Sequence, residues 1–266
     1  MRMGSEAKNS KRATRRMNKD QFCYKRRDCS VSVVVPAKDE AGNIFGVVER
    51  MPSLGTHTEI IFVDGCSTDG TREQIHKVMK AYPKKDIKFM TQSGTGKANA
   101  VFEAFDAAQG DLLIILDSDL TVAPEELSGF YEPYAEGRAD FLNGCRFVYP
   151  MEKGAMRFLN WIANHFFAMS LSAVLGFRIK DTLCGTKAIG RKAYFRLKEV
   201  RADFGQVDPF GDFDLIFGAA ELSLTVLDIP VRYRARQYGD IKIRRFRDGF
   251  RLLKMLAVLF ERKVLL

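Results

Sequence analysis

The sequence alternates strand-like apolar runs with segments of helical periodicity, and this alternation limits the possible fold more than any other feature. Four short apolar runs are Val31–Val35, Glu59–Val63, Ile87–Met90 and Leu112–Leu116. Helical patterns follow the first three runs. Strands that alternate with helices at this spacing pair in parallel, because each helix returns the chain to the starting edge of the sheet. We therefore predict an α/β domain with a mostly parallel sheet flanked by helices, and with its function at the carboxyl ends of the strands.

Length and charge divide the chain into three regions. The 266 residues, 46% of them hydrophobic, suffice for one well-buried domain. Most of the net charge of +9 comes from residues 1–29, which hold ten Lys or Arg and three acids. We expect residues 1–29 to form a flexible basic tail, 30–243 the single catalytic domain, and 244–266 a basic amphipathic helix that either packs on the sheet or lies on a membrane surface.

Several classes of protein are disfavoured. The basic tail lacks the apolar segment of a signal peptide, and the five cysteines form no C-x-x-C pair, which is typical of reduced thiols in the cytosol. Because the chain has only three histidines and no C-x-x-C pair, the sequence shows no zinc site. Residues 158–177 are apolar over about one membrane-spanning length. Because they contain Asn160, Asn164 and His165, we expect an amphipathic or core helix instead of a span.

Two carboxylates follow the fourth apolar run. Asp117 and Asp119 stand two residues apart in LLIILDSD. Acids at the carboxyl end of a buried strand are suited to hold Mg²⁺ or Mn²⁺ over a nucleotide diphosphate, since carboxylates favour hard cations. A solvated Asp-Ser-Asp turn that caps the helix at Pro124 is the alternative.

Four segments, in order, resemble the family 2 glycosyltransferases, which have the GT-A fold: VSVVVPAKDEAGNI, EIIFVDGCSTDGT, a Gly-Lys segment and LDSD. The resemblance runs from about Val31 to Met255, and the second half is similar to the branch that acts on polyprenyl phosphates. It implies a metal site at Asp117 and Asp119. The residues that it implies for the nucleotide-sugar are Pro36, Ala37, Glu40, Asp64, Lys97 and Asp117.

The Gly-Lys segment is not an ATP-binding P-loop. Ala98 follows Lys97 where a P-loop requires Ser or Thr, and Thr91 stands where its first Gly should be. ATP hydrolysis is therefore disfavoured.

The acceptor side is implied by the segments GCRF, DTLCGTK and RARQYGDIK, which match the polyprenyl-phosphate branch. The cations that would grip a lipid phosphate are Arg146, Lys187, Arg236 and Lys242. Asp214, in GDFDLIF, matches an acidic position that acts as general base in relatives with hydroxyl acceptors.

These patterns predict an inverting, metal-dependent glycosyltransferase bound peripherally at the cytosolic face of a membrane. It would transfer a sugar from UDP or GDP to a polyprenyl phosphate, and a membrane-protein partner could complete its attachment. One rival is the same fold acting on a glycan hydroxyl with Asp214 as base. Another is a non-catalytic membrane or nucleic-acid binder, which would not need the two acids; we expect no specific nucleic acid partner.

Overall fold

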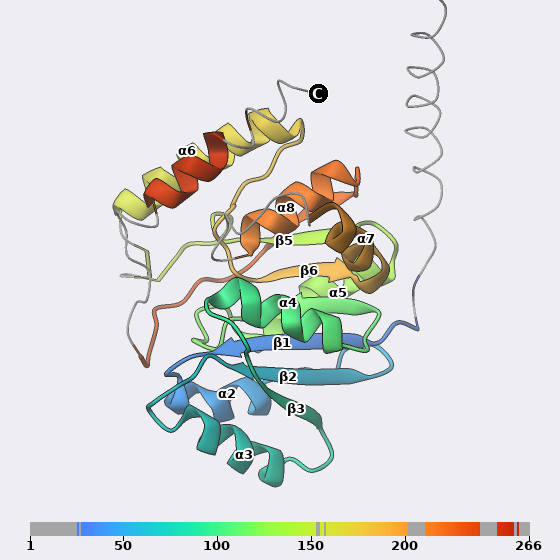
Figure 1. Ribbon diagram of the computed structural model, residues 1–266, viewed down its shortest axis with the longest axis vertical. Coiled ribbons are helices and arrows are strands. Elements are labelled where there is room, and N and C mark those ends of the chain that lie inside the picture. Colours follow the sequence, from blue (N-terminus) through green and yellow to red (C-terminus); the bar gives the residue numbers. More distant parts are fainter. Residues whose placement is uncertain are drawn as a thin grey trace, which may run out of the picture.

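A computed structural model describes residues 26, 28–152, 155–156, 158–201, 211–239, 249–257 and 260. In this part of the chain seven strands form one mixed sheet in the order β3-β2-β1-β4-β6-β5-β7 (Figure 1). The strands are β1 (Val31–Ala37), β2 (Thr58–Asp64), β3 (Asp86–Thr91), β4 (Leu112–Ile115), β5 (Phe141–Cys145), β6 (Lys187–Gly190) and β7 (Val226–Pro230). Strands β1 to β4 are parallel to one another, and β5 is parallel to β7, whereas β6 runs antiparallel to both of its neighbours, β4 and β5.

Helices cover both faces of the sheet (Figure 1). Helices α2 (Ile44–Glu49), α3 (Thr71–Ala81) and α5 (Ser128–Ala135) contribute to the core cluster on one face. Helices α4 (Lys97–Ala107), α7 (Arg191–Arg201) and α8 (Asp212–Glu221) contribute to the cluster on the other. The remaining elements are the 3₁₀ turns η1 (Ala41–Asn43) and η2 (Pro124–Leu127) and the long helix α6 (Phe158–Leu175).

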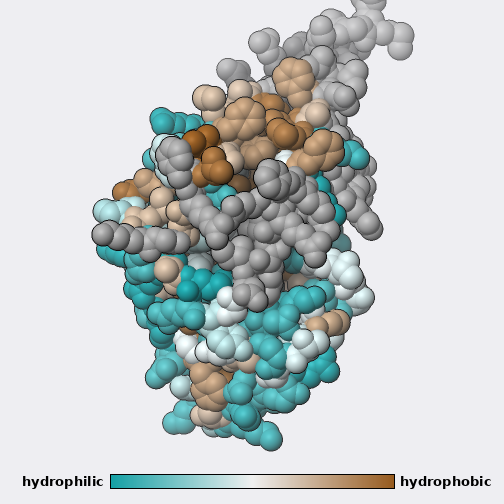
Figure 2. All heavy atoms as spheres, turned by 90° about the vertical axis from the view of Figure 1, so that its left-hand side faces the viewer, coloured by the Kyte–Doolittle hydropathy of each residue, from teal (hydrophilic) through white to brown (hydrophobic). Residues whose placement is uncertain are grey.

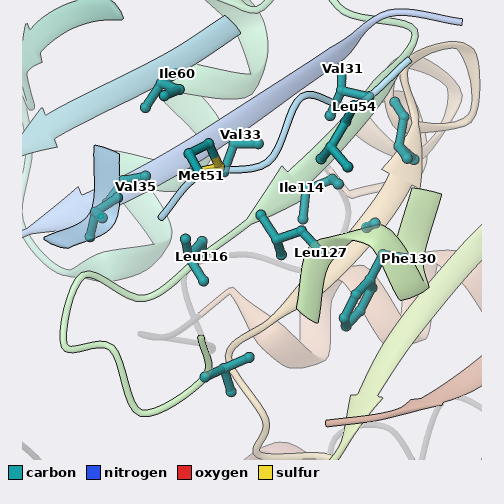
Figure 3. Packing of buried hydrophobic residues seen from close by; sticks show 14 of the residues in the cluster. Val31, Val33, Val35, Met51, Leu54, Ile60, Ile114, Leu116, Leu127 and Phe130 are labelled. Carbon is teal, nitrogen blue, oxygen red and sulfur yellow. The ribbon is translucent and has the colours of Figure 1, made fainter. Parts of the chain in front are cut away.

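Strand β1 shows why the strand sequences are almost continuously apolar. Val31, Val33 and Val35 point into the cluster shown in Figure 3, together with Ile114 and Phe130. Successive side chains of a strand point to opposite faces, so Val34, between them, belongs to the core cluster on the other face. A strand that is buried on both faces needs no alternation of apolar and polar residues.

Helix α6 packs outside these layers, over α8 (Figure 1). A third cluster joins Phe167 and Leu171 of α6 to Phe213 of α8 and to Leu252 and Met255. Residues 249–257 are helical, so the described part of the basic C-terminal segment is a helix that packs against α6 and α8. The helices in the described part of the chain are all too short or too polar to span a bilayer.

The predicted fold class is confirmed, with differences at the ends of elements. The helical segment expected after the first apolar run is divided into η1 and α2. The tail prediction lies almost wholly outside the described residues, but Arg26 pairs with Asp140 at 2.7 Å and Cys29 is buried. The last residues of the expected tail therefore contact the domain.

Two helical glycines should respond oppositely to substitution by Ala. A Cβ at Gly218 of α8 would lie 2.3 Å from Cγ of Leu197, whereas one at Gly129 of α5 would lie 3.6 Å from Ile229. Ala favours helix by up to about 1 kcal/mol, and overpacking a core costs about 1–3 kcal/mol. We expect urea denaturation to show a lower free energy of unfolding for Gly218→Ala and an equal or higher one for Gly129→Ala. A stable Gly218→Ala variant would contradict the tight α7–α8 contact.

Candidate active site

The candidate site lies where the order of the sheet reverses. Strand β1 pairs with β2 on one side and with β4 on the other, and all three are parallel. From β1 the chain first builds one half of the sheet and then crosses to the other half. Loops diverge at the carboxyl ends of strands at such a switch point and leave room for a ligand. Asp117 and Asp119 follow β4 at this point.

Each of the two acids contacts a cation from a distant part of the chain. Lys97, the first residue of α4, places its Nζ 2.5 Å from Oδ1 of Asp117. Arg236 donates from Nη2 to Oδ2 of Asp119 at 2.7 Å. Thr121 donates from its backbone N and its hydroxyl to the other oxygen of Asp119, at 3.1 and 2.7 Å. The acids are therefore held by ion pairs and oriented by the following turn.

The two acids differ in how readily they ionise. Burial opposes ionisation of Asp117, but the nearby cations, Lys97 above all and then Lys187 and Arg146, together lower the pKa of that carboxyl. Burial, followed by the negative charge of Asp117, raises the pKa of Asp119 in spite of Arg236. Burial likewise opposes the charge of Lys97, yet Asp117 and Asp212 raise its pKa. The negative charge is therefore less favourable on Asp119 than on Asp117.

Gly185 is a site residue that the sequence analysis did not single out. A Cβ at this position would lie 2.0 Å from Oδ2 of Asp117 and 2.5 Å from Nζ of Lys97. Only a residue without a side chain permits this approach of the backbone to the ion pair. Its place in DTLCGTK was the available signal.

The loops after β1 and β2 interlock beside the acids. Asp64, the last residue of β2, is fully buried, and it accepts hydrogen bonds from Ser67 N and Arg72 Nη2, each at 3.1 Å. Glu40 accepts from Nη1 of Arg236 at 2.7 Å, and its own backbone N donates to Thr71 Oγ1 at 2.8 Å. Arg236 thus connects the first loop to the acid pair.

Pro36 and Ala37, the other residues expected at the nucleotide, end strand β1. Ser118, between the two acids, donates to the carbonyl of Pro36 at 2.9 Å. Ala37 is opposite Asp64 in the β1–β2 register. The structure therefore brings all the predicted donor residues to one edge of the sheet.

Arg146 and Lys187, expected to grip a phosphate, are buried and paired with acids. Arg146 donates from Nε and Nη2 to the two oxygens of Asp181 at 2.7 and 2.8 Å. The ammonium of Lys187 donates to the carbonyl of Cys184 and lies 3.2 Å from Asp212. Both cations are buried against a carboxylate, Arg146 at 8% and Lys187 at 0% exposure, which favours a positioning role over direct contact with a phosphate.

Of the other two residues expected near the acceptor, Lys242 and Asp214, the structure describes only Asp214. Lys242 lies outside the described residues. Asp214 is buried in the first turn of α8, close in sequence to Asp212, the partner of Lys187. Asp214 is thus largely buried, with 8% of its surface exposed.

Asp117 and Asp119 suit a hard divalent cation. Within the described ranges, no group of three or more His, Cys, Asp or Glu gathers around one point. Two carboxylates plus the oxygens of a bound diphosphate are a usual ligand set for Mg²⁺. The residues therefore fit a cation that is bound together with the donor.

Comparison with known sequences decides the family. The sequence model described as "Glycosyl transferase family 2" matches residues 32–197, more than half of the chain. The chain belongs to glycosyl transferase family 2. The predictions of the family and of a glycosyltransferase are thereby confirmed, and the matched region contains Asp117, Asp119, Lys97 and Arg146 but ends before Asp214 and Arg236.

Individual relatives extend the similarity beyond this region. Glycosyltransferase AglJ of Haloferax volcanii is 28% identical over 222 residues, which cover 83% of this chain and 68% of that protein. The dolichol-phosphate mannosyltransferase of Pyrococcus furiosus is 26% identical over 228 residues. That match covers 80% of this chain but only 59% of the relative, so the chain spans little more than half of that enzyme.

Solved structures confirm the GT-A fold. The mannosyltransferase PcManGT of Pyrobaculum calidifontis, solved with GDP-Man and Mn²⁺, superposes with a TM-score of 0.59 at 18% identity. The superposition covers 97% of this chain and 71% of that one.

The buried Arg146–Asp181 pair should be costly to break. Burial opposes ionisation of Asp181, yet Arg146 outweighs it and lowers the pKa of that carboxyl. We expect Asp181→Asn to lower the free energy of unfolding by about 3–5 kcal/mol at neutral pH, because Arg146 would stay buried without its counter-charge. Denaturation of Glu136→Gln is the control, since its exposed pair with Arg138 is worth about 0–1 kcal/mol.

The same pair predicts a pH dependence. A lowered pKa in the folded state means that the ionised Asp181 stabilises the fold above the ordinary carboxyl pKa of about 4, and that this contribution is lost as the pH falls further. The difference in the free energy of unfolding between wild type and Asp181→Asn should therefore become smaller below that pH. A constant difference down to the acid transition would contradict the ion pair.

Proposed function

We propose that this protein is an inverting glycosyltransferase that transfers a sugar from a UDP- or GDP-sugar to a polyprenyl phosphate. The observation that carries the proposal is the acid pair Asp117–Asp119 at the switch point of the sheet, with the predicted acceptor cation Arg236 in contact with it. Membership of the family supports the reaction class. Similarity to a dolichol-phosphate mannosyltransferase supports the acceptor class.

The donor is held, in this proposal, by the loops after β1 and β2 and by the acid pair. Asp64 and Glu40 border the nucleoside, and Lys97 provides positive charge at the phosphates. When bound, Mg²⁺ or Mn²⁺ supplies further positive charge that offsets that of the leaving diphosphate. Because Gly185 has no side chain, its backbone leaves room for the side chains of Asp117 and Lys97.

The acceptor reacts as an anion. A phosphate oxygen is already deprotonated at neutral pH, so it attacks the anomeric carbon in line with the departing diphosphate without a general base. Arg236 would position that phosphate by hydrogen bonds to two of its oxygens. Asp214, buried at the start of α8, then supports the structure and does not accept a proton.

Transfer assays on variants test this division of roles. Radiolabelled UDP- and GDP-sugars should label a polyprenyl phosphate in the presence of Mg²⁺ or Mn²⁺. We expect Asp119→Asn to lose about 100-fold or more in kcat/KM because charge at the leaving group is no longer balanced, and Asp214→Asn to lose less than about tenfold. The control Glu136→Gln removes a carboxylate from an exposed ion pair and should retain wild-type activity.

The opposite pattern would support a hydroxyl acceptor. In that case the wild-type enzyme would label a glycan and no lipid, and Asp214→Asn would lose all transfer. This result would exclude the polyprenyl phosphate proposal.

A peripheral membrane position is supported by the surface near α6. Large apolar side chains are exposed along this helix, among them Leu159 and Met169, each 69% exposed. Phe250 and Leu253 on the neighbouring C-terminal helix are exposed as well. Figure 2 shows hydrophobic residues gathered in the upper part of this side of the molecule, above a mostly hydrophilic lower part. An exposed apolar patch beside cations such as Arg251 is suited to an anionic membrane surface.

The single tryptophan reports on this contact. Trp161 lies on α6 and is 40% exposed, so transfer into a bilayer interface should shift its emission to shorter wavelength. We expect the shift on titration with vesicles that contain phosphatidylglycerol, and about tenfold weaker binding for the double variant Leu159→Ser/Met169→Ser. The matched control is Phe45→Ser on α2, where the side chain is 38% exposed. Unchanged emission at saturating lipid would contradict the membrane contact.

A further inference from the structure

Arg236 belongs to a strap, residues 233–239, that crosses from the acid pair to the first two loops. Tyr233 forms an isolated antiparallel bridge with Val122, and Arg234 N donates to the carbonyl of Thr121 at 2.8 Å. Further along, the ring of Tyr238 covers Gly42, where a Cβ would lie 2.6 Å from it. The strap is therefore anchored at both ends, with Arg236 between them.

Arg236 engages the oxygen of Asp119 that receives no hydrogen bond from Thr121. Oδ1 of Asp119 accepts both hydrogen bonds from Thr121, and Oδ2 accepts from Nη2 of Arg236 at 2.7 Å. Both oxygens are therefore engaged. A divalent cation at Oδ2 would stand within a few ångströms of the guanidinium, and two like charges at that distance in a half-buried site repel strongly.

Glu40 holds the other edge of the same guanidinium. Its Oε1 accepts from Nη1 of Arg236 at 2.7 Å, and its Oε2 accepts from Nδ2 of Asn43 at 2.7 Å. Glu40 is 3% exposed and its backbone N is bound to Thr71. Loss of the Asp119 contact would therefore leave Arg236 tethered at the site, with its Nη2 edge unpaired.

We propose that Arg236 and the divalent cation exchange on Asp119, and that the released edge of Arg236 becomes the grip for the acceptor phosphate. The inference rests on the proposed function. Before the donor binds, Arg236 neutralises Asp119. After the cation arrives with the nucleotide, Arg236 remains on Glu40 and turns its free donors toward an incoming anion. Metal and donor then favour acceptor binding, and by linkage the acceptor phosphate favours metal binding.

Binding of Mn²⁺ tests the exchange without any sugar transfer. The free Mn²⁺ signal in electron paramagnetic resonance gives its affinity for the full chain, alone and with UDP or GDP. Removing a competing cation should tighten binding, so we expect Arg236→Gln to raise the Mn²⁺ affinity by at least about fivefold. Arg234→Gln is the matched control, because it makes the same charge change on an exposed side chain two residues away.

Farnesyl phosphate is the probe for the second half of the exchange. In wild type its affinity should rise by about fivefold or more when Mn²⁺ and the nucleotide are present. In Arg236→Gln that increase should disappear, although Mn²⁺ binds more tightly. A residue that only supported the fold would weaken both ligands together.

Several outcomes would overturn the exchange. If Arg234→Gln raised the Mn²⁺ affinity as much as Arg236→Gln, the effect would come from net charge alone. If Arg236→Gln instead lowered the Mn²⁺ affinity, Arg236 would only support Asp119. Absence of Mn²⁺ binding to wild type would also overturn it. Failure of the proposed function is separate: it would appear as absent lipid labelling while the Mn²⁺ titrations still show the exchange.

Discussion

Two adjacent carboxylates at the end of a buried strand are the constraint on which the rest of the site depends. Asp117 and Asp119 repel each other, and the surrounding chain supplies one cation to each: Lys97 from the start of α4 and Arg236 from the strap. These contacts join segments that are 20 and 117 residues apart in sequence. The packing of the second half of the chain against the first is thus coupled to the balance of charge in the site.

A second buried charged centre positions the outer helix. Asp181 accepts from Arg146 and also from Nδ2 of Asn164, on α6, at 3.0 Å. Asn164 is 1% exposed. The polar residue that argues against a membrane span in the sequence is therefore the one that ties α6 to the domain. This contact therefore helps to fix the orientation of α6, including that of its exposed apolar side chains.

The sequence predicted more of the structure in the first half of the chain than in the second half. Strands β1 to β4, helix α3 and the place of both acids follow from local patterns, because buried parallel strands are marked by short apolar runs and their loops by Gly and Asp. In the second half, the cations were assigned by motif alone. The structure pairs Arg146 with Asp181 and Lys187 with Asp212, and a motif does not reveal such pairs, because their partners lie elsewhere in the sequence.

By itself, the sequence determined the fold class, the family and the strand that carries the acids, since periodicity and local motifs depend only on neighbouring residues. Only the tertiary structure decided which charges meet. It placed Arg236 between Glu40 and Asp119, brought the backbone of Gly185 against Asp117, and buried Arg146. The physical reason is that the energy of a charge depends on its burial and on the nearest opposite charge, and both are set by contacts between distant segments.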